Sequence, residues 1–380
     1  MFFCAKIIIV VSIICVGESV KKIEVFVATI LVKISYYLTY FCRIKAKRIS
    51  IISYFNDSLG LEFSRLAASL SSEYEVKYDL KKFNNSLWGK FKYLFSFIHQ
   101  TYLFNTSRLV ILDGNSFVYT RIKLKSQTKV MQLWHAIGAI KEFGSATTRR
   151  YDIKGYDYLI TSSDYFKTIF APRLNTKLSH TYALGNIKSD YLFDENYKEE
   201  QLQAFFVKYP QYLNKRIILY APTFRGDGIE DITYHEALKN INAHLKHDEV
   251  LIIKKHPLIR SENKANDLSQ EDLYSLMIVS DTIISDYSAL VFEAMLLQKK
   301  IILYWYDYQN YYQERGFSID TTNLDLPTAY NLKDLCDIIR TVKLSNYQAQ
   351  RSYYLNKCDG QSLARVIILI KEIMDGEKNV

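Results

Sequence analysis

The chain has 380 residues, of which 49% are hydrophobic and 23% are charged. This length and composition fit two or three globular domains and exclude a disordered chain, a collagen-like repeat and a small disulfide-stabilised protein. The 49 Lys and Arg residues exceed the 40 Asp and Glu residues, which leaves a net charge of +9. An excess of positive charge suits anionic partners such as nucleic acid, anionic lipid or a phosphate-bearing substrate.

The cysteine and acidic patterns give no sign of a metal site. The five cysteines show no C-x-x-C or similar spacing, which favours a reducing compartment and argues against zinc. No D-x-D acidic pair is present that would hold a metal-bound nucleotide, so the sequence does not indicate Mg²⁺. We therefore expect no required cofactor.

The first 48 residues differ in composition from the rest of the chain. Residues 7–16 are almost wholly apolar, but a membrane-spanning helix needs about 20 such residues. Residues 23–42 have that length but include Glu24 and Lys33, and a lysine near a helix centre costs about 2.5 to 3.5 kcal/mol on insertion. A basic flank follows, made of Arg43, Lys45, Lys47 and Arg48.

Aromatic residues beside a basic flank are typical of a segment that lies on an anionic lipid surface. We therefore predict that residues 1–48 associate peripherally with the cytoplasmic face of the membrane. A true membrane span and helices buried in the globular body are the two alternatives. A signal peptide fits less well, because only Lys6 precedes the apolar run and no clean cleavage pattern follows it.

From Ile49 onward, short apolar runs alternate with helical patterns, and ten of these runs are predicted strands. The strands are residues 49–54, 76–80, 109–112, 129–133, 158–161, 181–184, 217–221, 250–253, 282–285 and 301–304. Many runs are continuously apolar, which is typical of strands covered on both faces, so we expect parallel sheets flanked by helices. A turn-rich passage at residues 185–194 separates two groups of strands and favours two doubly wound α/β domains.

Polar side chains cluster directly after four of the predicted strands. In open parallel sheets ligands bind beyond the carboxyl ends of the strands, so these positions are candidates for a site. They comprise Trp134 and His135 with Lys141 further on, Thr223 to Asp227, Lys254 to Pro257, and Ser285 to Ser288. Each also has an ordinary interpretation: a lone His is usually a satisfied polar residue, a lone Arg a surface cation, and a Ser before a helix an N-cap.

Together, the clusters contain the groups that transfer of a phosphate group requires. Backbone amides at the helix start after Ser288 can hold phosphate oxygens, and Arg225 with Lys254 or Lys255 can offset the charge of a pyrophosphate. A neutral histidine can act as general base on a hydroxyl near pH 7. Neither a G-x-x-x-x-G-K loop nor a G-x-G-x-x-G loop follows a strand, which disfavours an ATPase or a dinucleotide dehydrogenase.

These segments resemble the CDP-glycerol glycerophosphotransferase family of teichoic acid and capsule synthesis. The similar elements are QLWHAIGAIKEFG at 132–144, GNIKSDYLF at 185–193, APTFR at 221–225, KKHP at 254–257, SDYSALVFEAMLLQKKIILYWYD at 285–307, ERGFSID at 314–320 and DGQSLARV at 359–366. None is specific by itself, but the seven occur in the order of the family and cover about residues 49 to 375.

The resemblance implies a GT-B fold, in which two Rossmann-like domains face each other across a cleft. It assigns residues 49–184 to an acceptor domain, 185–355 to a CDP-donor domain and 356–380 to a C-terminal helix that crosses back to the first domain. It also implies transfer of a polyol phosphate from a CDP-polyol to a hydroxyl of a lipid-linked saccharide or polyol-phosphate acceptor, with release of CMP. Glycerol phosphate is the first expectation for the transferred group and ribitol phosphate the second.

By the same resemblance, the catalytic residues would be His135, His256 and Arg225. The substrate-binding residues would be Trp134, Lys141, Thr223, Lys254, Ser285, Asp286, Ser288, Glu293 and Arg315. His135 would be the general base, Ser288 would hold the pyrophosphate, and Glu293 would bind the ribose hydroxyls. The sequence departs from the family pattern at Ala136, Asn186, Lys188 and Ala289, which bears on the polyol and the acceptor more than on the reaction.

Three other functions are compatible with parts of the sequence. A GT-B glycosyltransferase that uses a nucleotide sugar would keep the same basic site. A nucleic-acid-binding protein would explain the charge and the 31 Tyr, but no RNP or OB-type pattern appears, so no nucleic-acid partner is expected. A non-catalytic membrane scaffold is the third alternative. No oligomeric state is predicted.

Overall fold

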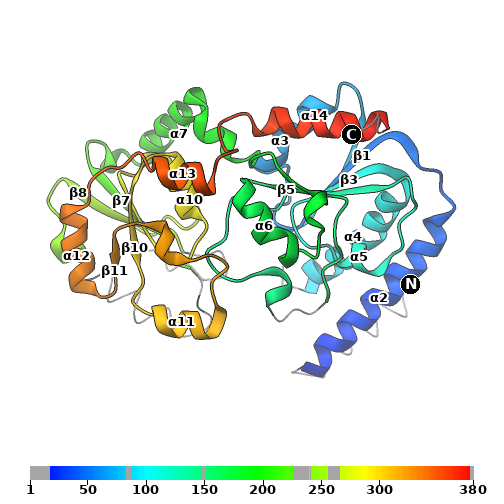
Figure 1. Cartoon of the computed structure of the whole chain (residues 1–380), viewed down its shortest axis with the longest axis horizontal. Helices are drawn as coiled ribbons and strands as arrows, with labels where there is room; N and C mark the ends of the chain where they lie inside the picture. Colours follow the sequence, from blue (N-terminus) through cyan, green and yellow to red (C-terminus); the bar gives the residue numbers. More distant parts are fainter. Residues whose placement is uncertain are drawn as a thin grey trace.

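The structure, a computed structural model, describes residues 18–82, 87–147, 151–223, 225, 239, 241–255 and 266–376. Its strands form two parallel sheets that lie side by side along the long axis of the molecule, each flanked by helices (Figure 1). The strand order is β2-β1-β3-β4-β5-β6 in the first sheet and β11-β10-β9-β7-β8 in the second. The α/β class with parallel sheets, predicted from the continuous apolar runs, is therefore confirmed.

The strands of the first sheet are β1 (Lys45–Ser53), β2 (Glu75–Leu80), β3 (Ser107–Leu112), β4 (Lys129–Gln132), β5 (Tyr158–Thr161) and β6 (Thr181–Ala183). Those of the second sheet are β7 (Arg216–Tyr220), β8 (Glu249–Ile253), β9 (Thr282–Ser285), β10 (Lys300–Tyr304) and β11 (Thr328–Ala329). The first half carries helices α2 (Glu18–Tyr40), α3 (Gly60–Leu70), α4 (Leu87–Thr106), α5 (Phe117–Arg121) and α6 (Asp164–Arg173). The second half carries α7 (Glu195–Lys208), α9 (Leu273–Val279), α10 (Leu290–Leu296), α11 (Tyr308–Arg315), α12 (Leu332–Thr341) and α13 (Gln348–Tyr354). The last helix, α14 (Ser362–Asp375), packs on the first half.

The ten predicted strands coincide with β1 to β10, and only the short β11 was not predicted among the strands described. The prediction that the first strand starts at Ile49 is wrong. Strand β1 begins at Lys45, which pairs with Ser107 of β3. Its first three residues are exposed and mostly charged, so they produce no apolar run in the sequence. A boundary between residues 48 and 49 therefore cuts through a strand.

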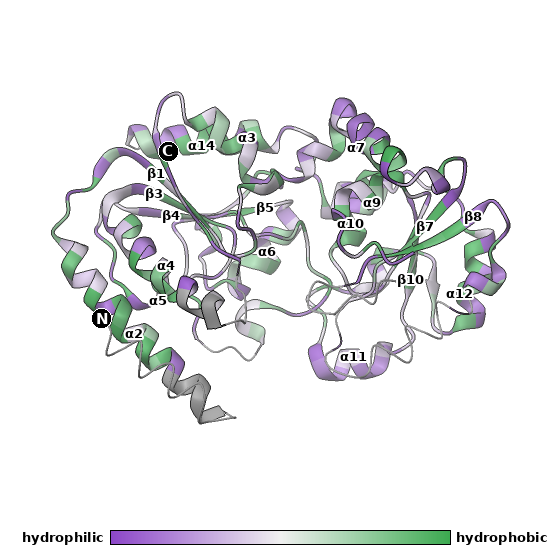
Figure 2. Ribbon diagram, turned by 180° about the vertical axis from the view of Figure 1, so that it is seen from behind, coloured by the Kyte–Doolittle hydropathy of each residue, from purple (hydrophilic) through white to green (hydrophobic). Residues whose placement is uncertain are grey.

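Helix α2 has two apolar faces. On one face Ala28, Val32 and Tyr36 are buried against α4, and the Tyr36 hydroxyl donates a hydrogen bond to the Lys123 carbonyl at 2.8 Å. Along the opposite face, large apolar side chains are exposed, and Figure 2 shows several apolar residues in the coloured part of the helix. The exposed set is Phe26, Ile30, Ile34, Tyr37, Leu38 and Phe41, called here the α2 stripe.

The basic flank after α2 is smaller than the sequence indicates. Arg48 is 2% exposed and forms an ion pair with Glu75 at 3.0 Å, so it does not contribute to the surface charge. Arg43, Lys45 and Lys47 are exposed as expected. Within the described ranges, no helix has both the length and the apolar character needed to span a bilayer.

The two halves pack together through loops that follow the carboxyl ends of their strands. The loop after β4 pairs with the segment after α11, where the N–H of Ser318 donates to the Ile140 carbonyl at 2.8 Å. A side chain at Gly138 would lie 2.7 Å from both Phe166 and Phe292, which belong to different halves, so glycine allows this close approach. The carboxyl edges of both sheets therefore meet in one region.

The chain returns to the first half at its C-terminal end. Helix α14 lies along the first sheet and buries Val366, Ile370 and Ile373 against it (Figure 1). Its first two N–H groups donate to the carboxylate of Asp190, which lies just after β6. The start of α14 is therefore tied to the crossing between the two sheets.

Candidate active site

His135 lies at the carboxyl edge of the first sheet, directly after β4. Its Nδ1 atom is 3.3 Å from the backbone carbonyl oxygen of Asp113, which follows β3. Because a carbonyl oxygen only accepts hydrogen bonds, Nδ1 carries the proton and Nε2 is left as a base. The imidazole packs against Phe55 and Trp134, with ring centroids 4.2 Å and 4.7 Å away. The ring is therefore held in one orientation and one tautomer.

The His135 imidazole is neutral at physiological pH. Although His135 is exposed by its solvent-accessible surface, the atoms around the ring desolvate it, and the positive charges of Lys188 and Lys141 add to this effect. Together they outweigh the hydrogen bond to Asp113 and lower the pKa of His135 to about 4. A neutral imidazole can take a proton from a hydroxyl group without first losing one.

Asp113 ties together the ends of β1, β3 and β4. Its carboxylate accepts hydrogen bonds from the Ser53 hydroxyl and, at 3.1 Å, from the N–H of Tyr54, while its backbone oxygen contacts His135. Burial raises the pKa of this carboxyl to about 7. Asp113 is not among the predicted site residues, although its place directly after the predicted strand at residues 109–112 is a signal that the sequence contains.

Arg225 is held inside the second half by two carboxylates. Its Nε donates to Asp307 at 2.7 Å, and its Nη1 lies 2.7 Å from the carboxylate of Asp286. The guanidinium also stacks 5.0 Å from the ring centroids of Tyr287 and Tyr311, and the side chain is only 6% exposed. The predicted contact of Arg225 with pyrophosphate stays a prediction, and its charge is already balanced within the protein.

The loop between β9 and α10 offers unused hydrogen-bond donors. Ser285 and Asp286 at its start are buried, and the Asp286 carboxylate accepts the N–H of Thr223 at 2.9 Å. By contrast, the N–H groups of Ser288 and Ala289 donate to no group in the part of the chain that the structure describes. The buried Thr223 hydroxyl has no partner there either. These donors lie where the sequence predicts the phosphate site.

Two predicted ligands, Lys141 and Glu293, are not fully bonded. Within the described ranges the Lys141 ammonium makes no ion pair or hydrogen bond, and burial lowers its pKa. Glu293 on α10 is 8% exposed, and its Oε2 atom has no hydrogen-bond partner among the described residues. Burial raises the pKa of Glu293 to about 7, against the opposing charge of Lys188. Arg315, the last residue of α11, is exposed.

The structure gives a different result for each of three other predicted residues. The Lys254 ammonium donates to the backbone carbonyls of Ser269 and Glu271 at 2.7 Å and 2.5 Å, so it is engaged within the second half. His256 lies outside the described residues, and its predicted role is not tested. Trp134 has a left-handed backbone with φ of 46°, which turns the chain sharply just before His135.

The predicted residues from the two halves come together in one region. The charge of Lys141 interacts with those of Asp286, Arg225 and Arg315 from the second half, and it also affects His135. Lys188, Glu62 and Asp307 belong to the same region but were not selected as site residues. Asp307 comes three residues after the end of a predicted strand, whereas Glu62 lies in the first turn of α3 and carries no comparable signal. Within the described ranges no cluster of acidic, His or Cys side chains could hold a metal ion.

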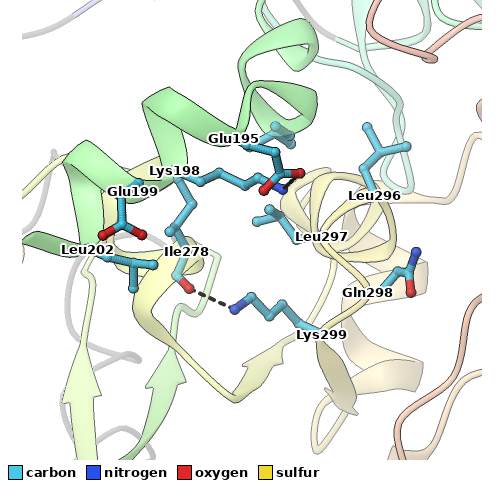
Figure 3. Close-up of a pocket in the computed structure, with 10 residues that line it drawn as sticks. Glu195, Lys198, Glu199, Leu202, Ile278, Leu296, Leu297, Gln298 and Lys299 are labelled. Carbon is cyan, nitrogen blue, oxygen red and sulfur yellow. Dashed lines mark hydrogen bonds and ion pairs between the residues drawn. The ribbon is translucent and has the colours of Figure 1, made fainter.

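A pocket of about 400 Å³ lies elsewhere, between α7 and the carboxyl end of α10 (Figure 3). Figure 3 shows Lys299 reaching the Ile278 carbonyl, and burial lowers the pKa of this lysine to about 8. The pocket is lined by Leu192, Glu195, Lys198, Glu199, Leu202, Ile278, Leu296, Leu297, Gln298 and Lys299. Because Lys299 precedes β10, the pocket is at the amino edge of the sheet and is distinct from the candidate active site.

Residues 34–372 match the family described as CDP-Glycerol:Poly(glycerophosphate) glycerophosphotransferase. The chain belongs to this family. It is therefore a phosphotransferase enzyme that transfers a polyol phosphate in teichoic acid synthesis, as the sequence resemblance implied.

The curated relatives include both primases and polymerases. The chain is 28% identical to a teichoic acid ribitol-phosphate primase of Bacillus spizizenii over 86% of its own length and 91% of the relative. It is 29% identical to a teichoic acid glycerol-phosphate primase of Bacillus subtilis, over 73% and 77% of the two chains. It is also 29% identical to a teichoic acid poly(ribitol-phosphate) polymerase of Bacillus spizizenii, but spans only 51% of that protein.

Solved structures support the fold. A structure of the wall teichoic acid polymerase TagF soaked with CDPG superposes with a TM-score of 0.72 at 18% identity, covering 92% of this chain and 94% of the other. A putative UDP-N-acetylglucosamine 2-epimerase from Listeria monocytogenes gives a TM-score of 0.53 at 11% identity, over 88% and 98% of the chains. At these identities the similarity establishes the fold alone.

Proposed function

We propose that this enzyme transfers glycerol phosphate, or ribitol phosphate as the second candidate, from a CDP-polyol to a hydroxyl of a lipid-linked acceptor. The acceptor is a saccharide or a polyol phosphate. The acceptor oxygen attacks the β-phosphorus and forms a new P–O bond, the bond to the α-phosphate oxygen breaks, and CMP leaves. His135 takes the proton of the attacking hydroxyl. The neutral, singly oriented imidazole of His135 is the observation that supports this proposal most directly.

The two halves divide the substrates between them. We assign the acceptor to the half that contains the first sheet, from β1 to residue 184, and His135, and the CDP moiety to residues 185–355. The N–H groups of Ser288 and Ala289, which donate to no described residue, suit the pyrophosphate. The Oε2 atom of Glu293, which has no hydrogen-bond partner among the described residues, suits the ribose hydroxyls. Residues 356–380 contain α14, which links the second half back to the first.

The α2 stripe provides a membrane-facing surface. Phe41 is 87% exposed and Leu38 76%, and such side chains are stabilised when they enter a lipid headgroup region. The exposed Arg43, Lys45 and Lys47 beside them suit the anionic cytoplasmic leaflet. We therefore propose peripheral attachment at the cytoplasmic face, which would bring a lipid-linked acceptor close to the first half.

The reaction is tested by mass spectrometry of products from a panel of CDP-glycerol, CDP-ribitol and UDP-sugars, each with a lipid-linked acceptor. Addition of one polyol phosphate with equimolar CMP supports the proposal and identifies the polyol. Transfer of a sugar from a UDP-sugar, with no reaction of the CDP-polyols, would contradict it and favour the glycosyltransferase alternative.

The membrane surface is tested by flotation with anionic vesicles. Leu38→Glu combined with Phe41→Glu should release the protein from vesicles without changing its thermal unfolding, because both side chains are exposed. Leu344→Glu, at an exposed leucine of the second half, is the matched control and should still float. Equal flotation of both variants would exclude the α2 stripe as the attachment surface.

A further inference from the structure

The segment after β6 is held rigidly where the two halves meet. A side chain at Gly185, whose φ is 98°, would lie 2.3 Å from the Lys357 carbonyl oxygen, so only glycine fits beside the returning chain. The Asn186 side-chain oxygen accepts the N–H groups of Lys188 and Ser189 at 3.1 Å and 3.2 Å. With Asp190 bonded to the start of α14, the backbone of this segment has little freedom.

Lys188 projects from this segment into a group of incompletely bonded side chains. Its Nζ lies 3.3 Å from Glu62 on α3 and 4.6 Å from the ring centroid of Tyr274 on α9. The Tyr274 hydroxyl and Glu293 Oε2 are both buried and have no hydrogen-bond partner among the described residues, and the two residues are 1% and 8% exposed. The Lys188 side chain keeps 22% exposure, so a ligand can reach it.

Unpartnered buried polar atoms are costly, because each loses its hydrogen bonds to water without replacement. Two such atoms beside a partly exposed cation are therefore evidence of a site built to bind a ligand. A ligand that carries both a phosphate and hydroxyl groups fits this set, since a lysine attracts phosphate and carboxylates accept hydrogen bonds from hydroxyls.

We propose that Lys188 binds the β-phosphate of the CDP-polyol, the group that is transferred. This inference rests on the function proposed above and adds a catalytic residue to it. The charge of Lys188 acts on both the proposed base, His135, and the proposed ribose ligand, Glu293, so the lysine is within electrostatic range of both groups that would flank the transferred phosphate. In the ligand-free enzyme Glu62 holds the lysine in place, and the phosphate takes over this ion pair when the donor binds.

Electrostatics agree with this position. The positive charge of Lys188 opposes protonation of His135 and favours the ionised form of Glu293, so it acts on both flanking groups. During transfer Lys188 keeps its proton and offsets the negative charge on the phosphoryl oxygens. The proton of the attacking hydroxyl goes to His135, and the electron pair of the broken P–O bond leaves with CMP.

The inference is tested by calorimetric titration with CMP, CDP and CDP-glycerol. CMP lacks the β-phosphate, so Lys188→Met should leave CMP affinity unchanged and weaken CDP and CDP-glycerol binding by about 10- to 100-fold. Ser288→Ala is the matched variant for the rest of the pyrophosphate site and should weaken all three ligands. An equal loss of affinity for CMP in Lys188→Met would overturn the assignment to the β-phosphate.

Kinetics separate a catalytic lysine from a structural one. Lys188→Met should lower kcat by about 10²- to 10³-fold, and Lys188→Arg should restore most of it. Lys371→Met, at an exposed ion pair on α14, is the control and should keep kcat within a few-fold. If Lys188→Met kept kcat near the wild-type value, or if Lys371→Met lowered kcat equally, the inference would be wrong.

The proposed function has a separate point of failure. If the wild-type enzyme binds CDP-glycerol and releases CMP while Lys188→Met retains full kcat, only the role of Lys188 is overturned. If the wild-type enzyme binds none of the three cytidine nucleotides, the proposed donor is wrong.

Discussion

The carboxyl edges of the two sheets differ in whether their cationic side chains are already bonded within the protein. In the second sheet Arg225 is bound by Asp286 and Asp307, and Lys254 is bound by backbone carbonyls. In the region of the first sheet, Lys141 has no ion pair within the described ranges and His135 presents a free Nε2.

This difference distinguishes cations that hold protein loops together from cations that can bind a ligand. A buried cation with two carboxylates holds its loops together, and its contact with a ligand requires that one carboxylate be released. A cation without a partner is ready to bind an anion. If the second half binds the phosphates as proposed, it does so mainly through backbone N–H groups, and the cation without an ion pair in the described ranges, Lys141, comes from the segment that faces it.

The largest effect on activity is expected at the carboxyl edge of the first sheet. His135→Ala should lower kcat by about 10²- to 10⁴-fold, because the attacking hydroxyl loses its general base. CDP affinity, measured by calorimetry, should remain near wild type since the imidazole lies on the acceptor side. Normal turnover of this variant with saturating donor and acceptor would refute the proposed mechanism even though the fold is correct.

At the carboxyl edge of the second sheet, where Arg225 is ion-paired, the largest change should be in the free energy of unfolding. Arg225→Ala leaves the buried Asp286 and the half-buried Asp307 without their cation, and breaking a buried ion pair typically costs about 3 to 5 kcal/mol. Urea unfolding of the variant should show this loss. If unfolding were unchanged while CDP affinity fell, Arg225 would be an available ligand, and the contrast between the two edges would disappear.

The sequence predicted most of this framework for a simple physical reason. Strands buried on both faces are continuous apolar runs, so β3 and β7 can be recognised without any knowledge of their neighbours. The charged start of β1 and the two-residue β11 carry no such pattern, and they form because neighbouring strands supply hydrogen-bond partners.

The site was harder to predict than the fold. Strand ends pointed to His135 and Ser288, but a position in the sequence does not reveal which cations are already paired. The partner of Arg225, Asp307, follows a different strand, and their contact exists only once β7 and β10 lie in one sheet. Likewise the partner of Lys188 is Glu62, more than a hundred residues earlier in the chain, so no spacing could indicate it.

The second half also contains a buried carboxyl, Glu293, whose ionisation should cost stability. Its pKa is about 7 in the folded chain against an ordinary value of 4.5, so the folded state holds its proton more tightly than the unfolded state. The penalty for ionising it is absent below pH 4.5 and is complete above pH 7. At 1.36 kcal/mol per unit, Glu293→Gln should stabilise the fold by about 3 kcal/mol at pH 8.

Urea unfolding of wild type and Glu293→Gln at pH 4.5 and pH 8 measures this difference. The variant should be no more stable at the lower pH and clearly more stable at the higher one. Asp113 titrates in the same range, but it is present in both proteins and cancels in the comparison. A gain in stability of equal size at both pH values would show that the buried carboxyl does not ionise as described.

The smallest effect is expected for Lys141, whose substitution should change ligand affinity but not stability. The backbone around Lys141 joins the two halves, with a bridge to Phe317, but its ammonium is free within the described ranges. Lys141→Met keeps the length of the side chain and removes the charge, so unfolding should shift by less than about 0.5 kcal/mol, as for a substitution that breaks no contact. Affinity for CDP-glycerol should nevertheless fall by about 10-fold, the loss of one hydrogen bond to a charged group. A variant that loses stability and keeps its affinity would place Lys141 with Arg225 among the anchors.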